Sequence, residues 1–252
     1  MNILNRVLTP GLLSLLFIFP NALSAQWNKK PYTEWSEKEV SRMLENSPWS
    51  QTQVFTDTSK NFSNSNGTTT IADLINVNFR VRFLSAKPVR QAIGRSVELQ
   101  QKGKLPDQMA AQLKAFAAAD FPDYIIVTVL CNSDKASNML QQALSLLQKL
   151  KTSELKNNTY LMGKDGERLF LQEYQPPRDD GLGARFVFPR LVNGKPFITP
   201  ESGEVLFHSE LGGGSLLNST IPNSSSSNRF NGFTLNTRYK VKDMVFDGKL
   251  EY

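Results

Sequence analysis

The chain has 252 residues, of which 40% are hydrophobic and 21% charged, as expected for a globular protein rather than a disordered one. Its net charge is +6, but cations are interspersed with acids, and no run of Lys or Arg forms the basic patch that is typical of nucleic-acid binding. One Cys and one His, Cys131 and His208, are too few for an internal disulfide or a zinc site. The composition therefore argues against zinc enzymes and nucleic-acid binding, and no cofactor is predicted.

Residues 1–25 have the order of a secretory signal peptide. Arg6 lies in a short n-region, residues 7–19 are apolar apart from four positions, and small residues precede Gln26. The apolar run is shorter than the roughly 20 residues that a membrane-spanning helix needs. We therefore expect cleavage after Ala25, with Ser24 as the competing position, and an exported protein, periplasmic or extracellular, without a transmembrane anchor. Cleavage removes one charged side chain, Arg6, and leaves a net charge of +5.

Residues 26–50 form an aromatic block around one predicted helix. Ser36 and Glu39 have the spacing of a capping box, apolar residues follow at helical spacing, and Ser47-Pro48 is a stop signal. We expect the aromatic residues of the block to attach this helix to the main domain as an N-terminal clasp. A ligand-stacking cluster is the functional alternative, and its members would include Trp35 and Trp49.

The next segment begins the main domain, which is predicted to span residues 51–252. Residues 53–57 are predicted as a short strand and residues 60–70 as a polar loop. Residues 75–84 alternate between apolar and polar side chains, as a half-buried strand does. Its apolar face carries Val77, Phe79 and Val81, and its polar face carries Arg80 and Arg82.

A helical insertion is predicted at about residues 86–151. Its three helices, at 88–101, 106–119 and 134–150, carry apolar stripes at Val89, Ile93 and Val97, at Met109, Leu113 and Phe116, and at Leu140, Leu144 and Leu147. Between the second and third helices, residues 124–131 are continuously apolar, as in a strand covered on both faces. Cys131 ends this strand and is interpreted as a buried, inert thiol.

From residue 158 onward the sequence predicts β-structure. Residues 159–162 and 169–174 flank an Asp165-Gly166 turn and read as a hairpin. Further strands are predicted at 184–189, 205–208, 233–241 and 244–252, the last from alternation that ends on Tyr252. Residues at about 212–230 are rich in Gly, Ser and Asn and are predicted to form a mobile loop.

Candidate site residues are few. Asp179 and Asp180 could contribute oxygen ligands to Ca²⁺, although the spacing of a calcium loop is absent and a solvated loop is the preferred interpretation. His208-Ser209-Glu210 has the residue types of a hydrolase, but neighbours on a strand point apart and a triad must converge. No Gly-x-Ser-x-Gly motif occurs. No catalytic, metal-binding or cofactor-binding residue is therefore predicted. The only candidates are Asp179, Asp180, His208, Trp35 and Trp49.

Three segments resemble a family of exported bacterial proteins of the acidobacterial type. They are Lys-Pro-Tyr-Thr-Glu-Trp-Ser at 30–36 with Ser-Pro-Trp at 47–49, residues 81–91, and residues 244–252. Some members of that family carry the label GWxTD domain, and this chain has no Gly-Trp-x-Thr-Asp string. The resemblance implies export. It implies no activity and no site residue.

Together these patterns predict an α+β protein, an antiparallel β-sandwich or half-barrel with an N-terminal helix and a helical insertion. The leading functional hypothesis is an exported, non-catalytic module that binds a protein or an envelope component. The alternatives are a periplasmic hydrolase that uses carboxylates or Ser, and an outer-membrane-associated assembly protein. A pocket in which Asp179, Asp180, Glu173 or His208 converge would favour the hydrolase.

Overall fold

A computed structural model describes residues 30–57, 74–102, 104–212 and 232–252. The expected signal peptide, the polar loop at 60–70 and nearly all of the low-complexity segment at 212–230 lie outside these residues. Within the described ranges, no helix has the length and apolar character needed to cross a membrane.

In the described residues, two larger antiparallel sheets contain most of the β-structure. The larger has five strands in the order β1 (Ser50–Asp57), β2 (Ile75–Phe83), β3 (Tyr124–Ser133), β7 (Ala184–Pro189) and β6 (Glu173–Gln175). The smaller has four strands in the order β11 (Phe233–Lys240), β10 (Glu204–Leu211), β4 (Thr159–Met162) and β5 (Arg168–Phe170). Two short hairpins accompany them, β8 (Leu191–Val192) with β9 (Lys195–Pro196), and β12 (Val245–Phe246) with β13 (Lys249–Leu250).

The inner faces of the two sheets share one aromatic core. Phe83 of β2 meets Tyr239 of β11 edge to face at 4.8 Å between ring centroids, and Phe186 of β7 meets Phe207 of β10 at 5.4 Å. The Tyr239 hydroxyl also donates a hydrogen bond to the carbonyl of Val81 across the core, at 2.9 Å. The alternating inward side chains of both sheets thus form a sandwich, and the predicted α+β class is confirmed.

One edge of the sandwich is joined by a side chain. Gln53 of β1 donates from Nε2 to the carbonyl of Thr234 at 2.9 Å, and its Oε1 accepts from the backbone N–H of Asn236 at 2.7 Å. Both partners belong to β11, the edge strand of the smaller sheet. The side-chain amide of Gln53 therefore links this edge of the larger sheet to the edge strand of the smaller sheet through two hydrogen bonds.

The opposite edge is closed by helices and by the chain itself. After β5 the chain leaves the smaller sheet and continues as β6 in the larger one. Helices α4 (Asn138–Lys149) and α5 (Thr152–Leu155) pack beside this crossing. The Tyr174 hydroxyl donates to the carbonyl of Leu147, and the Tyr174 N–H donates to Thr152 Oγ1 at 2.9 Å. These bonds hold β6 against both helices.

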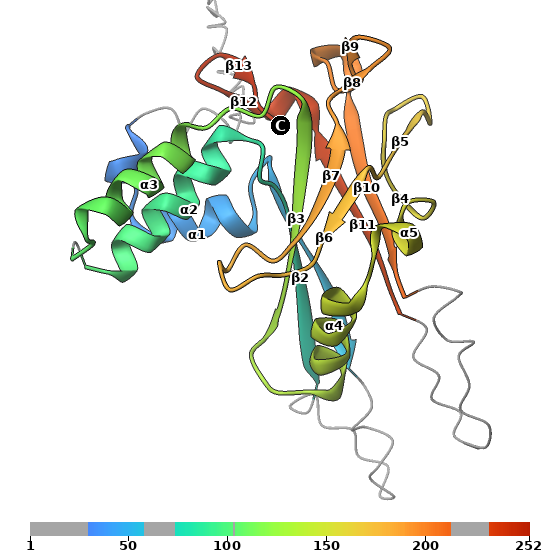
Figure 1. The fold of residues 1–252 in the computed structure, drawn as a ribbon, viewed down its shortest axis with the longest axis horizontal. Helices are drawn as coiled ribbons and strands as arrows, with labels where there is room; N and C mark the ends of the chain where they lie inside the picture. Colours follow the sequence, from blue (N-terminus) through green and yellow to red (C-terminus); the bar gives the residue numbers. More distant parts are fainter. Residues whose placement is uncertain (1–29, 58–73, 103, 213–231) are drawn as a thin grey trace, which may run out of the picture.

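A layer of three helices lies beside the outer face of the larger sheet, on the side away from β4 and β5 (Figure 1). They are α1 (Glu37–Glu45), α2 (Lys87–Gln100) and α3 (Asp107–Ala118). The predicted capping box is present: Ser36 accepts from the N–H of Glu39, and the Glu39 carboxylate accepts from the N–H of Ser36. Helix α2 carries Pro88 in its first turn, where a missing N–H costs nothing.

The predicted helical insertion at 86–151 contains β3, which is the central strand of the larger sheet. The segment is therefore part of the sandwich and not an addition to it. Two of its predicted apolar stripes are wrong in part, since Met109 is 43% exposed and Leu144 is 41% exposed. Helix α3 packs mainly on α2 rather than on a sheet, and so it buries little more than Ala117.

The predicted terminal strand at 244–252 is also wrong. Val245–Phe246 and Lys249–Leu250 pair with each other across the two-residue turn Asp247-Gly248. Both turn residues have positive φ, 49° and 74°, as a tight hairpin turn requires. The alternation of apolar residues was genuine, but the Asp-Gly turn interrupts it.

Candidate functional site

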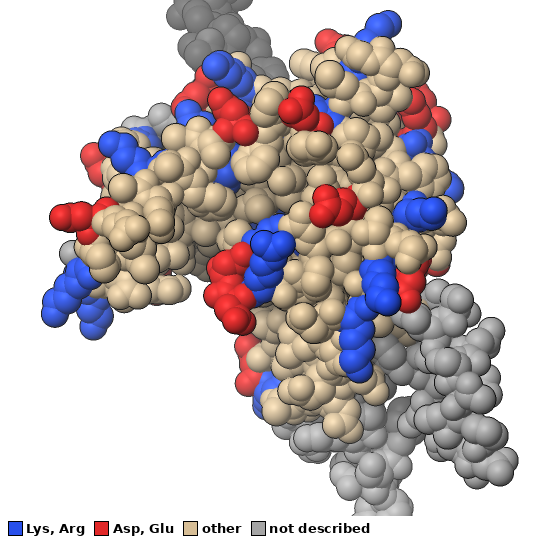
Figure 2. Space-filling model, viewed as in Figure 1, with Lys and Arg blue, Asp and Glu red and all other residues tan. Residues whose placement is uncertain are grey.

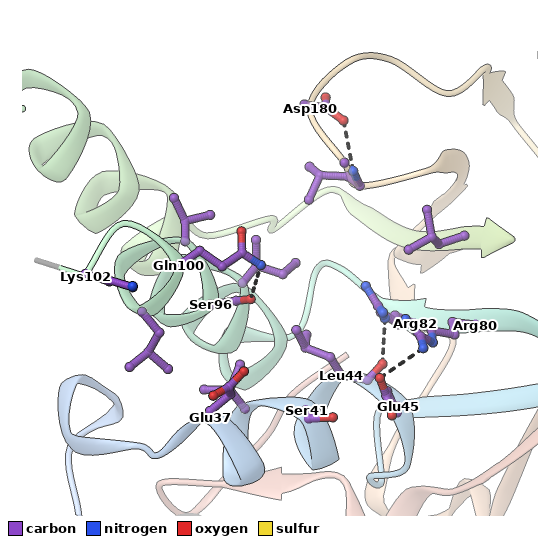
Figure 3. A pocket seen from close by; sticks show the side chains of 17 residues that line it. Glu37, Ser41, Leu44, Glu45, Arg80, Arg82, Ser96, Gln100, Lys102 and Asp180 are labelled. Atoms are coloured by element: carbon purple, nitrogen blue, oxygen red, sulfur yellow. Dashed lines mark hydrogen bonds and ion pairs between the residues drawn. The ribbon is translucent and has the colours of Figure 1, made fainter. Parts of the chain in front are cut away.

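A cleft of about 710 Å³ lies between helices α1 and α2 and the outer face of the larger sheet (Figure 3). The loop between β6 and β7 forms part of its rim. Figure 2 shows the surface hollowed beside the helical layer, with charges of both signs over that loop. Several apolar side chains line the cleft: Val40, Leu44, Ile93, Val97, Leu99 and Leu130. We refer to it as the arginine cleft because of the two residues described next.

Strand β2 places Arg80 and Arg82 at the cleft. Because side chains alternate along a strand, the burial of Val81 and Phe83 in the core turns Arg80 and Arg82 to the outer face. Arg80 forms an ion pair with Glu45 of α1 at 3.1 Å, between Nη2 and Oε1. Its charge is therefore already balanced.

Arg82 is in a different situation. It is only 6% exposed, and its Nε donates to the carbonyl of Leu44 at 2.7 Å. Within the described part of the chain, its two terminal nitrogens have no hydrogen-bond or ion-pair partner. Figure 3 shows the end of its guanidinium directed into the cleft. Burial, and secondarily the charge of Arg80, lower the pKa of Arg82 to about 10, although the charge of Glu45 acts in the opposite direction, and Arg82 is still a cation at neutral pH.

Asp180 lies on the rim, in the loop between β6 and β7. Burial opposes its ionisation, but hydrogen bonds from the N–H of Leu182 at 3.1 Å and from Arg185, together with the Arg185 charge, lower the pKa of Asp180. Arg185 occupies the same cross-strand row as Arg82, with Thr128 between them. Asp180 thus pairs with the second arginine of this row, whereas Arg82 has no ion pair within 4 Å among the described residues.

The other polar candidates do not join this site. Asp179 is exposed in the same loop, and Glu173 is exposed on β6. His208 lies on β10, where its ring stacks on Tyr160 at 4.6 Å and its Nδ1 is 2.8 Å from Asn236 Oδ1. These residues do not converge. Among the described residues, no three His, Cys, Asp or Glu side chains are grouped to hold a metal ion.

Trp35 and Trp49 lie inside the core, at 1% and 0% exposure. Both meet Phe246 of β12 edge to face, at 6.5 and 6.2 Å between ring centroids. Trp49 Nε1 also donates to the carbonyl of Glu251 at 2.8 Å. Buried in this way, neither ring has a face available for stacking on a ligand.

Arg80 and Arg82 were not among the candidates from the sequence. The available signal was the polar face of the predicted strand at 75–84, on which both residues fall. Arg residues are common on the exposed face of a strand, so this pattern by itself does not indicate a site. The feature becomes distinctive only because α1 and α2 enclose it, and their packing involves residues far away in the chain.

In comparisons with protein families, curated proteins and solved structures, no match to this chain was found. The function is therefore inferred from the geometry of the site.

Proposed function

We propose that the protein is an exported, non-catalytic binding module whose arginine cleft holds a carboxylate attached to an apolar part of its ligand. The observation that carries this proposal is Arg82, a nearly buried cation whose terminal nitrogens face a cavity and are unpaired within the described residues. A carboxylate that reaches these nitrogens would form charge-assisted hydrogen bonds, which are roughly twice as strong as neutral ones.

The charged residues that line the cleft balance in number, Arg80, Arg82 and Lys102 against Glu37, Glu45 and Asp180, and Arg82 is the buried one among them. Arg80 is paired with Glu45, and Arg185 is paired with Asp180. In the row, Arg82 is the cation that has no ion pair within 4 Å among the described residues. A guanidinium has five N–H donors, of which Nε–H is already used here, and its terminal nitrogens fit the two oxygens of a carboxylate.

The apolar lining defines the remainder of the ligand. Side chains such as Ile93, Val97 and Leu99 on α2 face Leu130 across the cleft, and apolar walls with a few fixed polar groups are the usual make-up of a ligand site. A fatty acid and the free C-terminus of an apolar peptide both have the required chemistry.

The first experiment is a calorimetric titration of the mature protein with pairs of ligands, each pair an acid and its neutral analogue. Decanoate is compared with 1-decanol, and acetyl-Leu-Phe is compared with its C-terminal amide. We expect the acid of at least one pair to bind about ten-fold or more tightly than its neutral analogue, since a hydrogen bond to a charged group contributes about 1.5–3 kcal/mol. Whichever acid binds identifies the source of the carboxylate. Equal binding of acid and neutral analogue in both pairs overturns the proposal.

Variants locate the binding. Arg82→Gln is expected to abolish the preference for the acid, whereas Arg168→Gln, on β5 of the smaller sheet, leaves it unchanged. Because Arg82→Gln also loses the bond to Leu44, Ser96→Trp provides a second variant that fills the cleft from α2 and leaves Arg82 in place. Ser96→Trp is expected to reduce binding. Unchanged binding in a folded Ser96→Trp protein contradicts the assignment.

The hydrolase alternative required convergence of acidic residues with His208. Asp180 lies beside the larger sheet and His208 on the smaller one, so these residues do not form a common site. We further propose that residues 1–25 direct export, which predicts that N-terminal sequencing of periplasmic protein begins at Gln26. Recovery of the protein in salt-washed membranes would instead favour the outer-membrane-associated alternative.

A further inference from the structure

A second cavity, of about 440 Å³, opens on the outer face of the smaller sheet. The helices α1, α2 and α3 lie on the other side of the molecule (Figure 1). Four cations line this cavity, and we refer to it as the cationic cavity: Lys164, Arg238, Lys240 and Lys242.

The four cations come from two segments of the chain, residues 238–242 and the turn between β4 and β5. Arg238 and Lys240 are two residues apart on β11 and so share its outer face. Lys242 follows in the short helix η7 (Val241–Asp243), whose first N–H donates to the carbonyl of Gly203 at 2.9 Å. Lys164 reaches over from the turn between β4 and β5. Its Cδ lies 3.4 Å from where a Cβ would stand on Gly203, so its aliphatic stem passes over that glycine.

Charge is strongly unbalanced in this cavity. Among the described residues, none of the four cations has a side-chain hydrogen bond or an ion pair within 4 Å. The one acid in the lining is Glu204, which stands opposite Lys240 in the strand register. Met162 and Leu206 supply an apolar floor. The lining therefore has a net charge of +3 over a partly apolar base.

We infer that the cationic cavity is a binding site for a phosphate-bearing ligand. A phosphate monoester carries about −1.5 to −2 charges at neutral pH and three acceptor oxygens, which suits several convergent cations better than a single carboxylate does. Arg238 can bind it with two parallel hydrogen bonds, and the lysines act as point charges. The cationic cavity and the arginine cleft share no lining residue, so a test of one site is independent of the other.

The phosphate could belong to a soluble compound or to a lipid headgroup, and two arms of one experiment distinguish these sources. The first is calorimetric titration with pyrophosphate, compared with acetate at equal ionic strength. The second is sedimentation with vesicles of equal parts phosphatidylcholine and phosphatidate, compared with phosphatidylcholine alone. Saturable binding of pyrophosphate but not vesicles indicates a soluble ligand. Vesicle binding indicates a headgroup. Absence of both overturns the inference.

Variants test the site itself. The double variant Arg238→Gln/Lys240→Gln is expected to bind pyrophosphate about ten-fold or more weakly than wild type, because each charge-assisted hydrogen bond is roughly twice as strong as a neutral one. Glu204→Gln removes the opposing charge and is expected to tighten binding. The control Lys149→Gln/Lys195→Gln makes the same change of net charge at exposed positions outside the cavity. If the control variant lost as much affinity for pyrophosphate, the effect would follow from net charge alone, and the proposed site would be contradicted. Arg82→Gln is expected to leave pyrophosphate binding unchanged.

Discussion

At the start of α1, Glu39 collects more hydrogen bonds than a helix surface residue usually does. Its Oε2 accepts from Lys30 Nζ at 2.8 Å, from the Ser36 N–H at 2.8 Å and from the Ser36 hydroxyl at 2.6 Å. The bond with Lys30, followed by those with Ser36, lowers the pKa of Glu39 from 4.5 to about 2. The same side chain therefore caps the helix and holds the segment that precedes it.

The lowered pKa predicts a pH-dependent effect. A depressed carboxyl pKa stabilises the folded state fully above the unfolded value, near 4.5, and this contribution is lost as the pH falls toward about 2. Urea unfolding should therefore show Glu39→Gln less stable than wild type at neutral pH, with the difference shrinking through this window. Ser36→Ala should cost about 1 kcal/mol at neutral pH, as N-cap removal does. A difference for Glu39→Gln that grows on acidification would contradict the assignment.

The thiol of Cys131 is predicted to be unreactive in the native protein. It lies on the inner face of β3, and burial raises its pKa to about 12, so the nucleophilic thiolate is scarce. Treatment with a chromogenic disulfide reagent at mildly alkaline pH should label no Cys131 before unfolding and one thiol per chain after addition of denaturant. Rapid native labelling would mean that β3 opens locally.

At the scale of elements, the β12–β13 hairpin packs through aromatic contacts against Trp35 and Trp49, which lie just before and after α1. Phe246→Ala removes a buried ring from between Trp35 and Trp49, and large-to-small changes of this kind cost about 3–5 kcal/mol. Urea unfolding followed by Trp fluorescence measures the loss. Leu191→Ala in the β8–β9 hairpin, where the side chain is 47% exposed, is the control and should change stability by less than about 0.5 kcal/mol. Similar losses in both variants would contradict this packing.

Element type was predictable where local chemistry decides it. The capping box of Ser36 and Glu39, the alternation of residues 75–83 and the Asp165-Gly166 turn each produced the structure they predict. The predicted strand at 244–252 is wrong because the Asp247-Gly248 turn folds the alternating segment back on itself. The spacing of Met109 and Leu144 shows which face of each helix is apolar. It does not show how much of that face the neighbouring elements cover, and so it could not predict that both side chains are exposed.

At the scale of the whole molecule, Gln53 joins the edges of the two sheets and its replacement tests that junction. Gln53→Ala removes two hydrogen bonds to β11, and each contributes about 0.5–1.5 kcal/mol. We expect a loss of about 1–3 kcal/mol in urea unfolding. Val54→Thr on the same strand, at a position 52% exposed, keeps a β-branched side chain and is expected to be nearly neutral. A neutral Gln53→Ala would show that the sheets are held by their core alone.

The two proposed binding sites also belong to this scale. The arginine cleft combines β2 with helices α1 and α2, and the cationic cavity combines β11, η7 and the β4–β5 turn. The cations of the two cavities did not stand out in the sequence, since each is unremarkable among its neighbours. Asp180 is the one candidate from the sequence that lines a cleft, and there it balances Arg185 rather than acting alone.

The sequence by itself determined the fold class, most strands and helices and the caps and turns, because these depend on residues a few positions apart. It also supports the expectation of export. Tertiary structure decided which faces are covered, and hence that Trp35 and Trp49 are core residues and that Arg82 is a buried cation facing a cavity. The physical reason is that burial and charge balance depend on partners such as Leu44 and Glu45 of α1, which the chain places next to β2 only when it folds.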